Sequence, residues 1–402
     1  MLTFEDALEK LLAGARPVTE VRWLPTQAAA GRVLAAEQRS TVQVPPLDNS
    51  AMDGYAVRAA DIGAVGTVLP VSQRIPAGNV GVTLEAGTAA RIFTGAPVPP
   101  GADAVVMQER CEHAGEGRVA FLHQPKAGEN IRRAGEDVAL GAAILAPGTR
   151  LGPSQLAFAA SVGLAELPVF RRLRVATFFT GDELKMPGEP LPPGTIYNSN
   201  RFAIVALLER LGCEVRDLGQ VPDTLAATRE ALRQAAAGSD LVITCGGVSV
   251  GEEDHVKPAV EAEGRLDLWQ IAIKPGKPLA FGEIRSDGGE AAFIGLPGNP
   301  VSAFVTFLML VRPFILRCQG VAEVAPRAYQ LRAASPWTKA DKRREFLRAS
   351  LTADGGVALY SHQGAGVMAS VVHADGLIDN PPGQTLEVGD PVRFLPFSEL
   401  LN

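Results

Sequence analysis

Carboxylates, lysines and glycines gather in five short stretches of a 402-residue chain. The stretches are TGDEL from Thr180, GQVPD from Gly219, GGVSVGEED from Gly246, KPGK from Lys274 and LPGNP from Leu296. Glu183, Asp223 and Asp254 offer the carboxylate oxygens that Mg²⁺ prefers, together with substrate phosphate oxygens. Taken singly, each has an ordinary structural role, as a helix-end charge, a turn former or a helix N-cap. It is their convergence on one place that favours a metal site.

The lysines and glycines of the same stretches suit an anion. Lys274 and Lys277 flank a stiff Pro-Gly turn and could clamp a phosphate or another oxyanion. The glycines of residues 246–251 lack the Walker and GxGxxG patterns, but such a loop lets backbone N–H groups approach a phosphate at a helix start. A solvated lysine pair and a tight strand-to-helix turn are the structural alternatives. The position of the lysines at the same predicted sheet edge favours binding for that pair, whereas both alternatives stay open for the glycine loop.

An alternation of strands and helices in residues 171–320 would bring the five stretches together. We expect strands at 173–179, 213–218 and 241–244, further apolar runs at 268–273, 278–281 and 291–294, and helices at 199–211 (capped by Ser199 or Asn200), 224–237, 254–263 and 301–316. Repeated βαβ units predict an α/β fold with a doubly wound, mostly parallel sheet. Ligands of such sheets bind at the carboxyl ends of the strands, which the five stretches follow.

The remaining sequence predicts three further units. Residues 1–41 and 140–170 are expected to form a helical, linking domain, because apolar side chains lie at helical spacing near the start and again at 154–162. Between them, residues 42–139 carry short apolar pieces split by frequent glycines and prolines, which predicts an inserted, β-rich domain. Residues 321–402 return to short alternating pieces, and we expect a C-terminal β-barrel there.

Charge and composition exclude several classes of protein. The formal net charge is −6 with no basic block, which argues against a nucleic-acid binder. The longest apolar stretch, residues 301–311, is too short to span a bilayer, and the N-terminus carries acids where a signal peptide carries lysines. Cysteines 111, 213, 245 and 318 lack metal-ligand spacing and are expected as reduced thiols. We therefore expect a cytoplasmic protein without a membrane or nucleic-acid partner.

The motifs form an ordered series along the chain. Besides TGDEL and GGVSVGEED, the series comprises DNSAMDGYAVR from Asp48, RIFTGAPVP from Arg91, GADAVVMQE from Gly101, ENIRRAGED from Glu129, IKPGKPLAFG from Ile273, GLPGNPVSA from Gly295 and HQGAG from His362. In this series the chain resembles the MoeA family, the molybdopterin molybdenumtransferases, which are related to the E domain of gephyrin. The resemblance implies an elongated homodimer of four-domain subunits. It also implies that the inserted domain of one subunit helps to complete the site of the other.

The resemblance implies an enzyme of molybdenum cofactor biosynthesis. Its substrates would be adenylylated molybdopterin and molybdate. Molybdate joins the dithiolene, the adenylyl link is hydrolysed with Mg²⁺, and AMP and molybdenum cofactor leave. Molybdopterin adenylyltransferase and recipient molybdoenzymes would be its protein partners. A molybdopterin adenylyltransferase is the alternative activity, although that enzyme is typically the α/β domain alone, and a gephyrin-like scaffold without catalysis is the alternative class.

The family's functional positions carry over residue by residue. The implied catalytic residues are Asp53, Asp137, Glu183, Asp223, Asp254 and Lys274. Glu183, Asp223 and Asp254 would hold Mg²⁺. The implied substrate-binding residues are Thr94, Gly246, Gly247, Ser249, Gly251, Lys277, Pro297, Gly298, Asn299, Pro300 and Arg348, the last for molybdate. Two positions depart from the pattern: Gln270 stands where relatives often carry lysine, and Ala365 replaces a serine. The preference between molybdate and tungstate is open for that reason.

Overall fold

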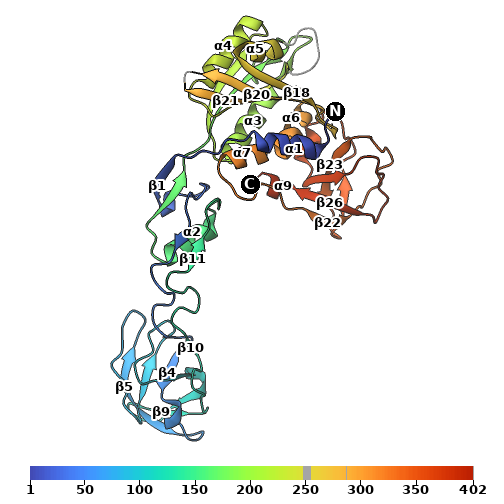
Figure 1. The fold of residues 1–402 in the computed structure, drawn as a ribbon. Helices are drawn as coiled ribbons and strands as arrows, with labels where there is room; N and C mark the ends of the chain where they lie inside the picture. The colour runs from blue at the N-terminus through green and yellow to red at the C-terminus, as the bar shows by residue number, and fades with distance from the viewer. Residues whose placement is uncertain (248–254, 287, 402) are drawn as a thin grey trace.

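The chain is elongated, with two folded parts at one end and a third at the other (Figure 1). A computed structural model describes residues 1–247, 255–286 and 288–401. The α/β sheet and the C-terminal sheet lie together at one end, and the inserted β unit lies at the opposite end (Figure 1). A narrow stretch that contains β1, α2 and β11 joins them. Residues near the α/β sheet are therefore far, within one chain, from those of the inserted unit.

The central sheet has six strands in the order β16-β13-β17-β21-β20-β18. Its strands are β13 (Arg174–Thr180), β16 (Glu214–Val221), β17 (Leu241–Cys245), β18 (Gly264–Gln270), β20 (Pro278–Ser286) and β21 (Gly289–Leu296). Strands β16, β13, β17 and β21 pair in parallel, as predicted. Strands β20 and β18 pair antiparallel, so the sheet is mixed. The connections 271–277 and 287–288 are too short for the crossover that a parallel pair needs.

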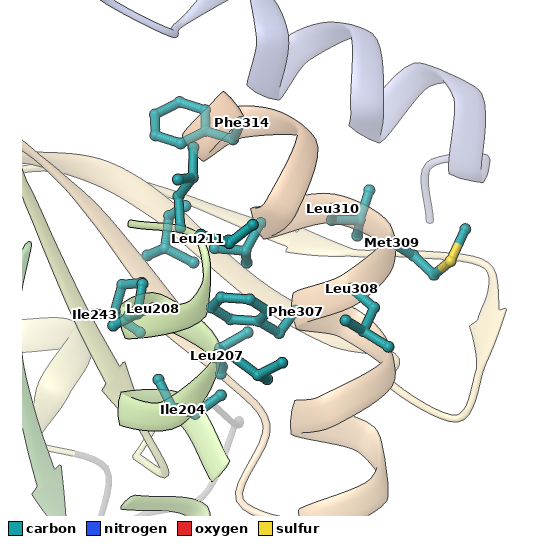
Figure 2. Packing of buried hydrophobic residues seen from close by; sticks show 14 of the residues in the cluster. Ile204, Leu207, Leu208, Leu211, Ile243, Phe307, Leu308, Met309, Leu310 and Phe314 are labelled. Atoms are coloured by element: carbon teal, nitrogen blue, oxygen red, sulfur yellow. The ribbon is translucent and has the colours of Figure 1, made fainter. Parts of the chain in front are cut away.

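Helices cover both faces of this sheet. One face carries α3 (Ser199–Arg210), α6 (Pro300–Thr306), the π-helical turn η4 (Phe307–Val311) and α7 (Arg312–Cys318), and the other carries α4 (Leu225–Ala236) and α5 (Val256–Glu263). Strand β13 shows why both faces are covered: Val175 and Phe179 join one apolar cluster, whereas Ala176 and Phe178 join the other. Figure 2 shows side chains of α3 against those of η4 and α7. The expected helices are confirmed to within a few residues.

The helical stretch Pro300–Cys318 is the only one, over the described residues, that is long and apolar enough to cross a membrane. It is 19 residues long with a mean hydropathy of 1.7, and 89% of its most apolar window is buried inside the protein. Its side chains pack in the core of the α/β unit from every side, as Figure 2 shows for Phe307, Leu308 and Leu310. The π-helical turn directly precedes α7, whose second residue, Pro313, has no N–H to donate to the preceding turn.

The N-terminal segment is α-helical only over α1 (Phe4–Ala13), so residues 14–41 lack the helical character expected for this part of the linking domain. Strand β1 (Val21–Pro25) pairs antiparallel with β12 (Glu166–Phe170), and β2 (Gln38–Arg39) pairs with β11 (Ala143–Leu145). A 3₁₀ turn, η1 (Thr26–Ala28), and helix α2 (Pro153–Ser161) complete this part. Pro17 and Pro25 cannot continue a helix. Helix α1 itself packs into the α/β core through Ala7 and Leu11.

The inserted segment is β-rich, as predicted. One sheet has the order β7-β4-β6-β5-β9-β8, and β3 pairs with β10. These elements are β3 (Asn49–Ser50), β4 (Gly54–Val57), η2 (Ala59–Asp61), β5 (Val68–Ile75), β6 (Ala89–Ile92), β7 (Ala104–Met107), η3 (Gln108–Arg110), β8 (Cys111–His113), β9 (Arg118–Phe121) and β10 (Ile131–Arg132). Two small apolar clusters, centred on Phe121 and on Ile92, lie within this unit.

The C-terminal sheet is attached directly to the α/β unit. Its elements are β22 (Tyr329–Arg332), β23 (Arg344–Leu351), β24 (Val357–Leu359), α8 (Ala369–Val372), β25 (Gly376–Asn380), β26 (Pro391–Pro396) and α9 (Phe397–Leu400). The ladder runs β24-β23-β25-β26-β22, and a bridge between Ala333 and Val357 joins its two ends. Strand β19 (Ile273–Lys274), from the α/β unit, pairs in parallel with β23. This pairing places the C-terminal unit beside the KPGK stretch.

Candidate active site

A cavity of about 710 Å³ opens at the carboxyl ends of the parallel strands. Loops after β13 and β17, the starts of α3 and α6, and the turn between β19 and β20 form most of its wall. The C-terminal unit contributes Arg343, Gln363, Gly364 and Ala365. The predicted residues that line the cavity are Glu183, Gly246, Lys274, Lys277, Pro297, Gly298, Asn299 and Pro300. Four of the five stretches singled out in the sequence therefore contribute residues to one cavity, and the fifth, GQVPD, does not.

Lys274 is held by acidic side chains of the C-terminal unit. Its Nζ lies 3.0 Å from Oε1 of Glu345 and 3.4 Å from a carboxylate oxygen of Asp341, and it lies 5.9 Å from the Trp337 ring centre. Three residues further on, Lys277 is exposed on the cavity wall and has no ion pair with any described residue. The turn between them needs glycine at 276, since its φ is 107° and an added Cβ would lie 2.2 Å from Thr306 Oγ1.

Arg343 adds a third cation that the sequence analysis missed. Its guanidinium donates to both carboxylate oxygens of Asp341, at 3.0 and 2.9 Å. These hydrogen bonds from Arg343 hold the pKa of the Asp341 carboxyl well below its usual range. Arg343 belongs to a basic run, KRR, that reads as surface charge in the sequence. Only the pairing of β19 with β23 brings this run to the cavity, so no local signal could have revealed it.

Unpaired polar atoms flank the cavity at two lining residues. Asn198, not Ser199 or Asn200, caps α3: its Oδ1 accepts a hydrogen bond from the Arg201 N–H at 3.1 Å. The Nδ2 of Asn198 and the Oγ1 of Thr180 are buried and have no hydrogen-bond partner among the residues that the structure describes. Buried donors in this state are rare in native proteins, and a polar ligand would satisfy them. The Nδ2 of Asn200 instead donates to the Gly298 carbonyl at 2.7 Å and joins two walls of the cavity.

Of the two predicted metal-binding carboxylates that follow β13 and β16, only that of Glu183 lines the cavity. Glu183 is exposed in the cavity wall, and its carboxylate has no hydrogen bond or ion pair with any described residue. Asp223 does not line the cavity. Its backbone N–H donates a hydrogen bond at 3.4 Å to the side chain of Asp182, the residue that precedes Glu183. Within residues 1–247, 255–286 and 288–401, no three His, Cys, Asp or Glu side chains form a metal site. Asp254 lies outside the described residues, as do Ser249 and Gly251.

The comparisons with known proteins agree along the whole chain. Family models match at 2–163 (MoeA N-terminal region, domain I and II), 176–317 (probable molybdopterin binding domain) and 330–397 (MoeA C-terminal region, domain IV). The molybdopterin molybdenumtransferase of Haemophilus influenzae is 42% identical over 409 residues, which cover 100% of both chains. The chain belongs to the MoeA family. Its place among the transferases of molybdenum cofactor biosynthesis, predicted from the motifs, is thereby confirmed, and the adenylyltransferase and scaffold alternatives are not favoured.

Further MoeA proteins support the same assignment. Molybdopterin molybdenumtransferase 2 of Mycobacterium tuberculosis is 38% identical over 390 residues, which cover 94% of this chain and 94% of its own. A solved MoeA structure from Pyrococcus horikoshii has a TM-score of 0.84 and 27% identity, and it covers 98% of this chain and 100% of its own. A second, with a TM-score of 0.78, is 31% identical and covers 99% of both chains. The MoeA architecture therefore extends over the full chain.

Arg348, expected from the MoeA motif to contact molybdate, lies behind the cavity wall. Its side chain is buried, and it donates to Ser370 Oγ at 3.1 Å, to the Phe346 carbonyl at 3.1 Å and to the Gly364 carbonyl at 3.4 Å. All three acceptors are neutral, and burial lowers the pKa of Arg348 to about 10. Arg348 therefore remains a cation at neutral pH. It supports the Gly364–Ala365 wall from behind and does not line the cavity itself.

The two departures from the MoeA pattern occupy different environments. Ala365 lines the cavity, and its carbonyl accepts the Val301 N–H at 3.0 Å, next to the start of α6. A serine here, which the resemblance implies for relatives, would place its hydroxyl in the wall itself. Gln270 is exposed at the end of β18 and does not line the cavity itself, although its partner in the strand register, Pro278, does. Gly247 likewise does not line the cavity, although Gly246 does.

Asp53, Thr94 and Asp137 belong to the inserted part of this MoeA chain. Asp53 Oδ1 accepts hydrogen bonds from the Thr94 N–H at 2.8 Å and from the Thr94 hydroxyl at 2.7 Å. These bonds, with the backbone one the stronger influence, lower the pKa of Asp53. Asp137 is exposed, and its N–H donates to the Val44 carbonyl. Asp53 directly precedes β4, and Thr94 follows β6, which pairs with β4. Strand β4 lies at the opposite end of the chain from the α/β sheet (Figure 1).

Proposed function

We propose that this MoeA protein inserts molybdate into adenylylated molybdopterin and hydrolyses the adenylyl link, releasing AMP and molybdenum cofactor. The observation that carries the proposal is the composition of one cavity. Its wall contains a carboxylate, that of Glu183, together with the cations Lys274, Lys277 and Arg343. Its volume of about 710 Å³ falls in the range for a small-molecule site. The wall mixes polar and apolar side chains, and it therefore suits an elongated anionic substrate with planar rings.

The cations would bind the anionic parts of both substrates. Lys277, which has no ion pair within the described chain, is available for a phosphate or molybdate oxygen. Asn198 Nδ2 and Thr180 Oγ1 would donate to further substrate oxygens, since both are buried and neither is paired within the described part of the chain. The backbone of the Gly246 loop, with Gly247, Ser249 and Gly251, would cradle the pterin phosphate. The Pro297–Pro300 segment would form the opposite wall.

Mg²⁺ would be held by carboxylates at this edge of the sheet. Glu183 and Asp223 follow the neighbouring parallel strands β13 and β16, and their oxygens are of the donor class that Mg²⁺ takes. Asp254 is the third ligand of the proposal. When bound, Mg²⁺ would neutralise charge on the phosphate oxygens. The residues themselves would orient the pyrophosphate link between Glu183 and the lysines.

A homodimer would complete the site. Asp53 and Thr94 adjoin β4 and β6, and Asp137 lies between β10 and β11. Strands β4 and β10 lie at the end of the chain opposite the α/β sheet that carries the cavity (Figure 1). We therefore propose that the inserted unit of one subunit reaches the cavity of the other, where Asp53 and Asp137 would act. Four domains with the expected bounds, ending in a β-barrel, are part of this proposal, and the bridge between Ala333 and Val357 supports the barrel.

The cellular setting follows from the same proposal. Molybdopterin adenylyltransferase would supply the substrate, and molybdoenzymes would receive the cofactor. A cytoplasmic location is supported by the four cysteines, which are all free, and Cys213, Cys245 and Cys318 are also buried.

The metal assignment is tested with two glutamine variants. Glu183→Gln removes a charged ligand from the cavity, and Glu209→Gln changes an exposed glutamate of the same unit outside the cavity. Glu183→Gln should need at least about tenfold more Mg²⁺ for half-maximal AMP release. Glu209→Gln should match the unsubstituted protein. An unchanged Mg²⁺ requirement in Glu183→Gln would remove Glu183 from the metal site.

A further inference from the structure

A fully buried glutamate lies directly behind the cavity wall. Glu345, on β23 of the C-terminal unit, has a side chain that is 1% exposed. Its Oε1 accepts a hydrogen bond from Lys274 Nζ at 3.0 Å, and its Oε2 accepts one from Trp337 Nε1 at 2.8 Å. Asn380 Nδ2 lies 3.5 Å from the same Oε2. A buried carboxylate is costly unless its oxygens are satisfied, and here each oxygen has a donor.

The backbone places Lys274 and Glu345 opposite each other. They are partners in the register of the parallel pair β19–β23, so the two side chains leave the ladder at the same point. Lys274 keeps about a third of its side chain exposed toward the cavity, whereas Glu345 is covered by the C-terminal unit. Glu345 thus binds the Lys274 ammonium on the side of the C-terminal unit, and the other side of the ammonium remains accessible from the cavity.

We propose that Glu345 is a positioning residue for Lys274. Glu345 holds the Lys274 ammonium at one position in the cavity wall before substrate binds. Binding of a substrate oxyanion therefore does not have to restrict the motion of the lysine side chain. Asp341 is the weaker partner, because it lies at 3.4 Å, is more exposed and already pairs with Arg343. Through Glu345 the C-terminal unit acts on substrate binding without touching the substrate. The inference rests on the proposed function, which gives Lys274 its oxyanion.

Substitution of Glu345 by glutamine tests this role. Glutamine offers one acceptor and one donor group, so it cannot accept from both Lys274 and Trp337 as the carboxylate does. Glu345→Gln should raise the KM for molybdate by about tenfold, with a much smaller change in kcat. Glu345→Asp, which keeps the charge, should recover part of this loss. Trp337→Phe removes the other donor but leaves Lys274 paired, and it should leave the molybdate KM nearly unchanged.

A double-mutant cycle separates positioning from a general structural effect. If Glu345 acts through Lys274, adding Glu345→Gln to Lys274→Ala should cause no further rise in the molybdate KM. Effects that multiply in the double variant would overturn the proposal. So would a Trp337→Phe variant with the same molybdate KM as Glu345→Gln, because the common cause would then be damage to the C-terminal unit.

A second readout needs no substrate. The rate at which an amine-reactive reagent labels Lys274 is measured by mass spectrometry, with Lys277 on the same turn as an internal reference. Glu345→Gln should raise the labelling rate of Lys274 severalfold and leave that of Lys277 unchanged. Equal rates in Glu345→Gln and the unsubstituted protein would overturn the proposal. An unsubstituted protein that labels as expected but releases no AMP would instead contradict the proposed function.

Discussion

Asp53 and Thr94 form a closed pair in which one carboxylate oxygen receives both the backbone N–H and the hydroxyl of the threonine, at 2.8 and 2.7 Å. The two residues lie 41 positions apart in the chain and meet because β4 pairs with β6. Hydrogen bonds to the charged form favour ionisation, so the pair keeps Asp53 an anion. In the proposed homodimer, an anion fixed in this way would orient a ligand or a lysine of the other subunit.

Thr94→Val tests what the hydroxyl contributes. Valine keeps the backbone N–H but removes the second donor, so the pKa of Asp53 should rise from its lowered value toward the ordinary range. Because the folded-state pKa lies below the unfolded one, ionised Asp53 favours folding at neutral pH, and this contribution disappears as the pH falls through the folded-state pKa. A carbon-detected NMR titration measures the shift. Thr94→Ser, which retains a hydroxyl, should titrate like the unsubstituted protein.

Asn198→Ala tests the unpaired amide in the cavity. The variant loses the cap of α3 and should cost about 1 kcal/mol of stability. Thr224→Ala is the matched control, because Thr224 caps α4 in the same way but does not line the cavity. Both should lose similar stability in urea unfolding. Only Asn198→Ala should also bind adenylylated molybdopterin more weakly, by about fivefold. Equal affinities in the two variants would show that Nδ2 does not meet the substrate.

Phe307→Ala tests the core that supports the site. Phe307 is 1% exposed and lies between α3 and the sheet, so its removal should cost about 3–5 kcal/mol. Phe202→Ala changes a phenylalanine of α3 that is 53% exposed, and it should cost no more than about 0.5 kcal/mol. Hydrogen exchange of the α3 amides measures the loss of stability in each variant for the α/β unit alone. Similar losses in the two variants would contradict the packing described for η4.

Mixing two variants tests the shared site, at an Mg²⁺ concentration too low for Glu183→Gln alone to release AMP. Asp53→Asn changes the inserted unit, and Glu183→Gln changes the cavity. If each site takes Asp53 from one subunit and Glu183 from the other, a random mixture forms one intact site in half of its dimers, and about a quarter of full activity returns. Each variant alone should remain inactive after the same unfolding and refolding. A mixture that stays inactive while forming dimers would place both residues in one subunit's site.

The sequence predicted the α/β core well because its signals are local. Alternating apolar runs and caps such as Thr224 determine strands and helices within a few residues, and the rule for the carboxyl ends of strands located the cavity. The N-terminal segment was misjudged after Ala13, because short strands that pair with residues 140 positions away leave little local pattern.

The residues that were missed are brought in by long-range pairing. Arg343 and Glu345 reach the cavity region only because β23 joins β19, some 70 residues earlier in the chain. Arg348 was expected in the cavity but lies behind its wall. Neither a motif nor its spacing distinguishes a residue that lines a cavity from one that supports the lining residues. The remoteness of Asp53 from its own cavity is likewise a property of the whole chain.

The most direct test of the account is the release of AMP from adenylylated molybdopterin by the purified full-length protein. The account predicts that AMP appears only when molybdate and Mg²⁺ are both present, and that the product activates a molybdoenzyme lacking its cofactor. Absence of molybdate-dependent AMP release from intact, folded protein would contradict it.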